Sequence, residues 1–318
     1  MLKAALPIIK WLYLVSLAVF GVFVAIRLDV EPLVGLSFDP VWLTVSLLLT
    51  FSWVWWQSAL WGQLLRDHST KIAIDPVQRN RLFASAWLTR YLPGKVPGLA
   101  SLAYQGTKLG VSRQKSSLVA VSQTVILALS MMLFASPAVW LLADLPNWFI
   151  IGFLATTFGL GAVLFFLSKE TPALQMIRWL WKKLTGKKLD DTRAFRRKTV
   201  LDAVARSMVS SSLLGLTQAS LLASIVPDMS FELFVIAIVV ANMAVVAGII
   251  AVIAPNGIGV REFVLFLGIS SLTSPEVAAG WALSARLLTT VGDLSFWLGS
   301  WGVLRIRNFF KSNGSGTR

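Results

Sequence analysis

Seven runs of mostly apolar residues divide the sequence into segments long enough, or nearly long enough, to cross a lipid bilayer. A transmembrane helix needs about 20 such residues to cross roughly 30 Å of hydrocarbon. The runs occupy residues 11–26, 41–63, 116–142, 148–167, 208–226, 231–254 and 277–304. Only 14% of the residues are charged, against roughly 25% in soluble domains. The sequence therefore predicts an all-α polytopic membrane protein.

Two further apolar stretches do not have the length or regularity of a span. Residues 260–272 are only about half as long as a span needs to be. Residues 83–104 are interrupted by charged and helix-breaking residues, namely Arg90, Pro93, Gly94, Lys95, Pro97 and Gly98. We expect both stretches to be irregular inside the membrane.

The distribution of charge predicts which ends of the spans face the cytoplasm. One set of links holds a single cation and seven acids: Arg27, Asp29, Glu31, Asp39, Asp144, Asp228, Glu232 and Glu276. Nearly all other cations fall in the alternate links or at the termini, which the positive-inside rule places in the cytoplasm. We therefore expect a multi-pass protein of the inner or plasma membrane with both termini cytoplasmic.

This orientation determines how the two irregular stretches must run. Basic links flank residues 83–104 on both sides, which predicts a re-entrant hairpin that enters and leaves from the cytoplasm. Residues 260–272 must cross, with residues 255–259 as non-helical chain. The prediction is about eight crossings plus one hairpin, in a single membrane domain over residues 1–311. The polar, Gly-rich residues 312–318 are expected to be a disordered tail.

The largest link, residues 169–206, carries 11 cations and four acids. Within it Ile177, Leu180, Trp181 and Leu184 recur at helical spacing. One interpretation is a surface helix that lies on the anionic cytoplasmic leaflet. The other is ordinary positive-inside bias. Either interpretation accounts for the chain's net charge of +14 without nucleic acid as a partner.

Several classes of chemistry lack the residues they require. The sequence has no Cys and one His, which argues against disulfides, thiolate nucleophiles and a Cys- or His-rich metal site. It has no Gly-x-x-x-x-Gly-Lys-Ser/Thr run, the motif that binds nucleotide phosphates in many NTPases. We therefore expect neither a cofactor nor a metal, and the sequence names no protein partner.

The break in the first half of the chain is the first candidate site. Its prolines and glycines, between Pro93 and Gly98, prevent a regular helix. Irregular chain at membrane depth is tolerated only where it lines a protein-lined or wet cavity. A helix starting near Pro97 would present free N–H groups beside Lys95, which favours an anion such as phosphate. The alternative is a kinked hairpin whose Arg90 and Lys95 extend to the interface.

The break in the second half is the second candidate site. It contains Pro255, Asn256, Gly257 and Gly259, followed by Arg261 and Glu262. Asn256 is expected to cap the next helix, while free N–H groups and Arg261 favour an anionic headgroup. Glu262 could pair with Arg261, cap the helix or accept a proton; the alternative to a functional site is a cap with a structural ion pair. Two such interrupted segments, one in each half, are typical of transporter binding sites.

Two charged residues, Arg286 and Asp293, lie within the last predicted span. Seven residues apart, they share a helix face but are separated by about 10 Å along it, so each needs a partner elsewhere. Charges within a membrane usually mark functional sites, although a structural ion pair between helices is the alternative. We interpret Gln123, Gln218 and Asn242 as hydrogen-bonding residues between helices.

These residues also carry a resemblance to a known family. The segment Leu92-Pro93-Gly94-Lys95, then Pro255-x-Gly257-x-Gly259-x-Arg261-Glu262, then Arg286, resembles the lysylphosphatidylglycerol synthase transmembrane-region family over roughly residues 41–307. Asn256 stands where many members have Gly. Some members carry a soluble aminoacyl-transferase domain after the membrane portion, which we expect this chain to lack. The resemblance implies a flippase-like membrane protein whose activity is lipid translocation.

Three functions are consistent with the sequence. The leading hypothesis is a transporter that moves an anionic phospholipid or a polyprenyl-phosphate-type (glyco)lipid between leaflets, with Lys95, Arg261 and Arg286 holding the phosphate. Arg90, Asn256, Glu262 and Asp293 complete the predicted substrate-binding set. The alternatives are an accessory subunit of an envelope-glycolipid system and an intramembrane lipid-linked transferase. The leading hypothesis predicts no enzymatic activity.

Overall fold

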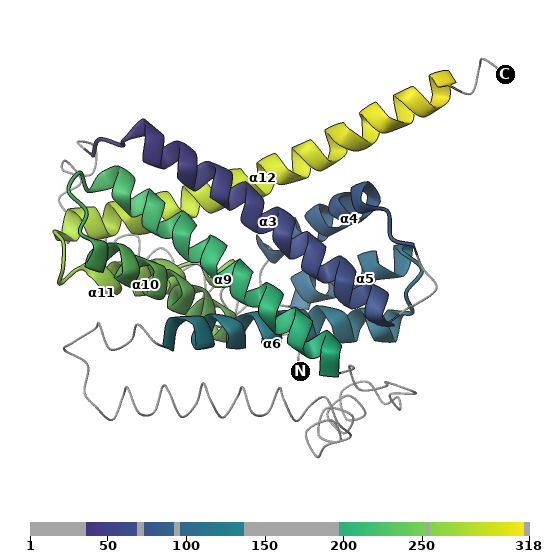
Figure 1. The fold of residues 1–318 in the computed structure, drawn as a ribbon, viewed down its shortest axis with the longest axis horizontal. Coiled ribbons are helices and arrows are strands. Elements are labelled where there is room, and N and C mark those ends of the chain that lie inside the picture. The colour runs from purple at the N-terminus through teal and green to yellow at the C-terminus, as the bar shows by residue number, and fades with distance from the viewer. Residues whose placement is uncertain (1–35, 69–72, 92–95, 137–196, 252–254, 315–318) are drawn as a thin grey trace, which may run out of the picture.

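The computed structural model describes residues 36–68, 73–91, 96–136, 197–251 and 255–314. Every regular element in these ranges is helical (Figure 1). The α-helices are α3 (Pro40–His68), α4 (Pro76–Leu88), α5 (Val96–Lys108), α6 (Arg113–Ala135), α9 (Arg197–Ile225), α10 (Phe231–Ile250), α11 (Val260–Ile269) and α12 (Pro275–Gly314). Two short 3-10 helices, η1 (Thr89–Tyr91) and η3 (Pro255–Gly257), lie at the two breaks.

Four of the described helices are long and apolar enough to span a membrane, namely α3, α6, α9 and α10. They confirm the predicted runs that begin near residues 41, 116, 208 and 231. The 40-residue helix α12 covers the predicted run 277–304. The predicted runs 11–26 and 148–167 lie outside the described residues, as does the proposed surface helix around residues 177–184.

Two predicted boundaries were wrong. Helix α9 already begins at Arg197, inside the basic link, because no Pro or Gly interrupts residues 197–214. Helix α12 continues through Gly314, three residues into the predicted disordered tail. The helix ends at a glycine, the residue that most often terminates helices; residues 315–318 lie outside the described part.

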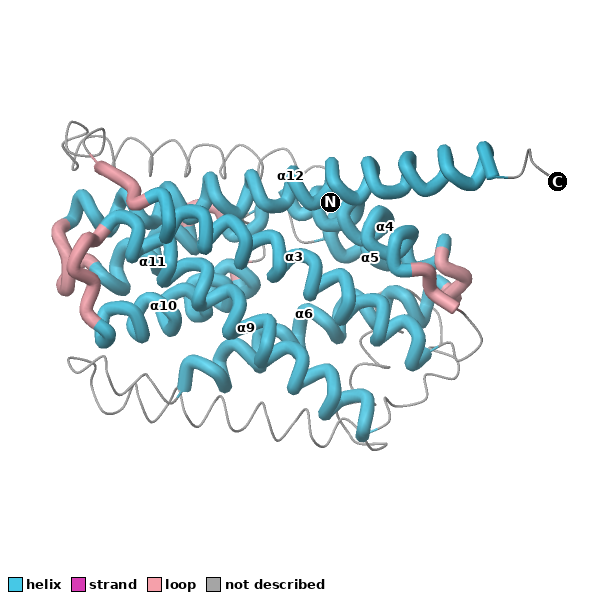
Figure 2. The backbone as a smooth tube through the Cα atoms, turned by 45° about the horizontal axis from the view of Figure 1, so that its top comes forward, coloured by secondary structure: helices cyan, strands magenta, loops and turns pink. Residues whose placement is uncertain are grey.

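Helices α3 and α9 pack side by side in opposite directions (Figures 1 and 2). The backbone N–H of Asp39, before α3, donates to the carbonyl of Ser224 near the end of α9 at 2.7 Å. Further along, Trp56 Nε1 donates to the carbonyl of Arg206 at 2.8 Å. Large apolar side chains fill the adjoining core, where Trp61 and Phe83 are fully buried. This helix pair forms a packed frame, beside which the broken segments lie.

Helices α4 and α5 form a hairpin on one side of that frame. Asp75 caps α4 and also pairs with Arg307 near the end of α12, at 2.5 Å. At the other end of the hairpin, a Cβ on Gly106 would lie 1.9 Å from Ser116 Oγ and 3.3 Å from Leu65 in α3. The start of α4 and the end of α5 therefore lie at the same end of the molecule, where α3 and α12 finish. This is the backbone course expected of a re-entrant hairpin, whose entry from the cytoplasm stays a prediction.

The second break also reverses the chain. Helix α10 enters it, and α11 leaves it packed against α10 and α12. The turn between them uses left-handed backbone at Asn256 (φ 48°), Gly257 (φ 68°) and Gly259 (φ 86°). The expectation that Asn256 caps the next helix was wrong: Gly259 is the N-cap of α11, because Asn256 is committed to the preceding 3-10 turn. Helix α11 has ten residues, which is about 15 Å, or half a span.

The two breaks meet inside the molecule. The 3-10 helix η1, at the end of α4, contacts η3, at the start of the second break. Residues that are about 165 positions apart in the sequence are thereby brought to one place, beside the middle of α12.

Candidate functional site

The tip of the hairpin is fastened to α12 through Asp293. The Asp293 carboxylate forms an ion pair with Arg90 and accepts hydrogen bonds from the Tyr91 hydroxyl at 2.6 Å and from Trp87 Nε1 at 2.9 Å. Asp293 is only 2% exposed. A buried carboxylate is tolerated when it is both paired and hydrogen-bonded, and this carboxylate has three donors from a single turn of the hairpin.

Aromatic rings surround the cations at this tip. The Arg90 guanidinium lies 4.1 Å from the centroid of the Trp87 ring. The Arg286 guanidinium lies 5.3 Å from the centroid of the Tyr91 ring. Both distances are within the range for cation–π attraction, which is strongest at desolvated sites. Tyr91 therefore contacts both Arg286 and Asp293 of α12.

The second break is fastened to α12 through Arg286. Its Nη1 lies 3.7 Å from Glu262 Oε1 and 3.5 Å from the carbonyl oxygen of Asn256. The other carboxylate oxygen, Glu262 Oε2, accepts the backbone N–H of Gly259 at 2.6 Å. Glu262 thus caps α11 and pairs with a cation, but that cation is Arg286 and not Arg261. Arg286 and Asp293 do not bridge each other, as their spacing predicted.

Arg261 differs from the other two arginines at the site. No ion pair or hydrogen bond joins its side chain to another residue that the structure describes. Its aliphatic stem lies against backbone: a Cβ on Gly248 would be 2.6 Å from Arg261 Cγ, and one on Gly257 would be 3.0 Å from it. The glycines at both positions therefore leave room for the aliphatic stem of Arg261, and its guanidinium extends beyond them.

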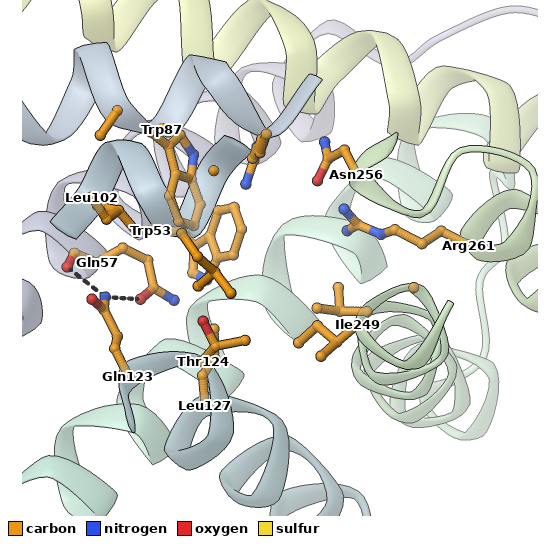
Figure 3. A pocket seen from close by; sticks show the side chains of 16 residues that line it. Trp53, Gln57, Trp87, Leu102, Gln123, Thr124, Leu127, Ile249, Asn256 and Arg261 are labelled. Carbon is orange, nitrogen blue, oxygen red and sulfur yellow. Dashed lines mark hydrogen bonds between the residues drawn. The ribbon is translucent and has the colours of Figure 1, made fainter. Parts of the chain in front are cut away.

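The guanidinium of Arg261 projects toward a cavity of about 480 Å³ (Figure 3). Its wall comes from α3, both arms of the hairpin, α6, the end of α10 and the second break. Leucine, isoleucine, valine and tryptophan side chains form most of the surface. Its polar members are Gln57, Arg90, Gln123, Thr124, Asn256 and Arg261. A mostly apolar cavity with a few convergent polar groups is typical of a binding site for a small molecule or a lipid headgroup.

The charges around the cavity do not cancel. Three guanidinium groups, of Arg90, Arg261 and Arg286, face two carboxylates, of Glu262 and Asp293. Both carboxylates are already paired, so the site retains a positive charge at Arg261. Among the described residues no group of three His, Cys, Asp or Glu side chains is placed to hold a metal ion. The arrangement is therefore suited to an anion.

A comparison with protein families identifies the architecture. The model of the family described as "Lysylphosphatidylglycerol synthase TM region" matches residues 10–294. The chain belongs to this family. Among curated proteins, none matches the chain. Family membership confirms that this is an integral membrane protein and connects it with membrane-lipid biology.

Most of the residues predicted for the site come together in this family member. Arg90, Asn256, Arg261, Glu262, Arg286 and Asp293 all lie around the two breaks. Gly98, in the first turn of α5, lines the cavity, and a Cβ there would lie 3.5 Å from the backbone of Arg90. Pro97 belongs to the same turn. Lys95, with Pro93 and Gly94, lies outside the described residues, so its predicted part in the site stays a prediction.

Gln57 was missed at the sequence level. Gln123, predicted to bond between helices, does so: its Nε2 donates to the Gln57 carbonyl at 3.2 Å and to Gln57 Oε1 at 3.3 Å. Gln57 Nε2 in turn donates to Ser210 Oγ at 2.7 Å. A single amide within an apolar run is a weak signal, because such residues commonly serve only to join helices. Of the other two predicted amides, Asn242 donates to the carbonyl of Ser211 at 3.2 Å, whereas Gln218 Oε1 has no partner among the described residues.

Proposed function

We propose that this membrane protein moves an anionic lipid between the two leaflets and binds the lipid phosphate at Arg261. The observation that carries the proposal is an arginine whose side chain makes no ion pair or hydrogen bond with another described residue, held at the edge of a cavity of about 480 Å³ where two broken segments meet. Phosphate is a multiply accepting anion, and arginine is the side chain best shaped to bind it.

The construction of the cavity supports transport of a headgroup. A flippase must give a polar headgroup a path across the hydrocarbon while the lipid tails stay in the bilayer. Irregular backbone at the two breaks leaves polar groups where a regular span would leave none. Helix α11 also begins beside the cavity, and the start of a helix favours negative charge. The membrane placement that goes with this proposal is the plasma membrane, with both termini in the cytoplasm.

The state of the two carboxylates favours transport over an intramembrane transferase. A transferase of this kind would need a carboxylate free to act as a base or to hold a metal. Asp293 accepts from three donors, and Glu262 is engaged by Gly259 and Arg286. Both are therefore occupied in holding the breaks together.

The proposal is tested with purified protein in liposomes that contain a fluorescent phosphatidylglycerol and no nucleotide or nucleotide-sugar. Reduction of the fluorophore in the outer leaflet by dithionite measures how fast inner-leaflet lipid becomes accessible. Loss of one charged hydrogen-bonding partner costs about 1.5–3 kcal/mol, so we expect R261Q to slow transport at least about tenfold.

A matched control is R81Q, which removes the same charge outside the cavity. The Arg81 guanidinium lies 4.1 Å from the centroid of the Trp301 ring, and the residue is not part of the cavity wall. We expect R81Q to transport lipid at close to the wild-type rate. Wild-type transport by well-folded, monodisperse R261Q protein would refute the proposed phosphate site.

A further inference from the structure

We infer that the cavity selects a lipid whose phosphate carries an uncharged, hydroxyl-bearing group, such as glycerol or a sugar, and discriminates against a headgroup that carries an ammonium. The inference rests on the proposed function, since it takes Arg261 as the phosphate contact. It adds what the rest of the headgroup must be.

The first observation is the charge of the cavity wall. Of the described residues that line it, Arg90 and Arg261 are charged and none is an Asp or Glu. The two carboxylates of the site lie outside this wall and are already paired with arginines. Because Asp293 compensates Arg90, an ammonium drawn into the cavity would meet chiefly the positive charge of Arg261, with no carboxylate on the described wall, in a medium of low dielectric constant, which is unfavourable.

The second observation is an unmatched donor next to Arg261. Asn256 Nδ2 is buried and has no hydrogen-bond partner among the described residues, and Asn256 lines the cavity. In Figure 3, Asn256 and Arg261 extend toward the cavity from the same side. A guanidinium and an amide N–H₂ are both donors, and an ionised phosphate offers only acceptors. This side of the cavity therefore suits the phosphate.

The third observation is an unmatched acceptor on the opposite side, where Gln57 and Gln123 lie (Figure 3). Gln57 Nε2 donates to Ser210, which leaves Gln57 Oε1 to accept from Gln123 Nε2. The remaining oxygen, Gln123 Oε1, has no partner among the described residues, and Gln123 is only 4% exposed. A buried acceptor without a donor is costly, and a hydroxyl group supplies the missing donor without adding a charge.

Together these groups match one type of headgroup: acceptors at the arginine end and a hydroxyl at the glutamine end. Phosphatidylglycerol and glycosylated lipid phosphates share that chemistry. A lysyl ester of phosphatidylglycerol, which has two amines, does not. We therefore expect this chain to bind phosphatidylglycerol in preference to lysylphosphatidylglycerol, the aminoacylated lipid in the family's name.

The inference is tested with three lipids that have identical acyl chains: phosphatidylglycerol, phosphatidic acid, which has the phosphate without a headgroup hydroxyl, and lysyl-phosphatidylglycerol. Their binding to the detergent-purified full chain is measured by native mass spectrometry titration. We expect phosphatidylglycerol to bind at least about five times more tightly than either of the others. This comparison uses wild-type protein, so it does not depend on any variant folding.

Two substitutions assign the preference to the glutamine. Q123M keeps the side-chain size and removes the acceptor, so it should erase the preference for phosphatidylglycerol over phosphatidic acid. Q63M is the matched control, because Gln63 Oε1 also lacks a partner among the described residues but does not line the cavity; it should keep the preference.

Each outcome has a distinct meaning. Equal binding of phosphatidylglycerol and phosphatidic acid, tighter binding of lysyl-phosphatidylglycerol, or an unchanged preference in folded Q123M would each overturn the inference. If phosphatidylglycerol is preferred but the wild-type protein moves no lipid in liposomes, the proposed transport fails and the selectivity stands. If transport depends on Arg261 but all three lipids bind alike, transport stands and the selectivity fails.

Discussion

Replacement of Asp293 by Asn is the most direct test of how the hairpin is held in the bundle. The substitution keeps the shape of the side chain but removes its charge. Three donors, from Trp87, Arg90 and Tyr91, currently converge on the carboxylate. An amide at this place supplies one acceptor oxygen and brings two further N–H donors toward the same three groups. Arg90 is left buried without its counter-charge.

The expected cost is large because the site is closed to solvent. Asp293 is 2% exposed and the Arg90 side chain 15% exposed. Removing one member of a buried ion pair typically costs about 3–5 kcal/mol, and we expect D293N to lose an amount in this range. The double variant R90M/D293L replaces both charges with apolar side chains, which is often close to neutral. It should therefore be more stable than D293N, and more stable than either of its parents, D293L and R90M.

The measurement is the free energy of unfolding in mixed detergent micelles for wild type, D293N, D293L, R90M and R90M/D293L. The cycle formed by the apolar variants should give a coupling energy of about 2–3 kcal/mol. D228N is the control, since Asp228 is exposed and its loss should change stability by no more than about 0.5 kcal/mol. A D293N protein as stable as D228N, or a double variant no better than its parents, would show that this ion pair does not hold the hairpin.

Three other predictions concern different parts of the molecule. G248A should slow transport several-fold, because the added Cβ would lie 2.6 Å from the cavity arginine's Cγ, whereas G299A, which meets nothing within 4 Å, should not. The chain has no native Cys, so single Cys probes can be placed at the exposed positions Gln78 and Ser112. Both probes should react with thiol reagents only from the cytoplasmic side; reaction from opposite sides would mean that the hairpin crosses the membrane. Burial opposes ionisation of Asp75, but hydrogen bonds from an arginine and two backbone N–H groups lower its pKa overall. Its stabilising contribution should be complete above the unfolded-state pKa of about 3.9 and be lost as the pH falls through the lower folded-state pKa, so D75N should flatten acid unfolding curves in this range.

The spans and the positions of the breaks could be predicted because each depends on local sequence. Apolar runs of bilayer length define α3, α6, α9 and α10. Pro and Gly inside an apolar stretch define where a helix stops, since they remove a backbone donor or favour left-handed backbone. The spacing of Arg286 and Asp293 also predicted correctly that each has a partner elsewhere, because that conclusion needs only the rise of a helix.

The identity of those partners could not be predicted in the same way. Glu262 is adjacent to Arg261 in sequence, yet it pairs with Arg286, because consecutive residues on a helix point in different directions. Asn256 was expected to be a cap, but its left-handed backbone at φ 48° depends on the packing of the whole turn. Gln57 entered the site through its contact with Gln123, 66 residues away. These facts arise from the relative placement of helices, which no local pattern specifies.

Helix α12 connects the two halves of the site and gives its charges a shared structural role. Asp293 holds the tip of the hairpin, and Arg286, about two turns earlier, holds the start of α11. Tyr91 links the two anchors, since its hydroxyl donates to Asp293 and its ring faces Arg286. Any movement of α12 relative to α10 must therefore shift both breaks together or separate one ion pair, at a cost of several kcal/mol. Arg261 belongs to neither anchor, and its side chain makes no ion pair or hydrogen bond with another described residue. In the proposed transport cycle the two ion pairs would therefore preserve the site, while Arg261 would bind the lipid phosphate.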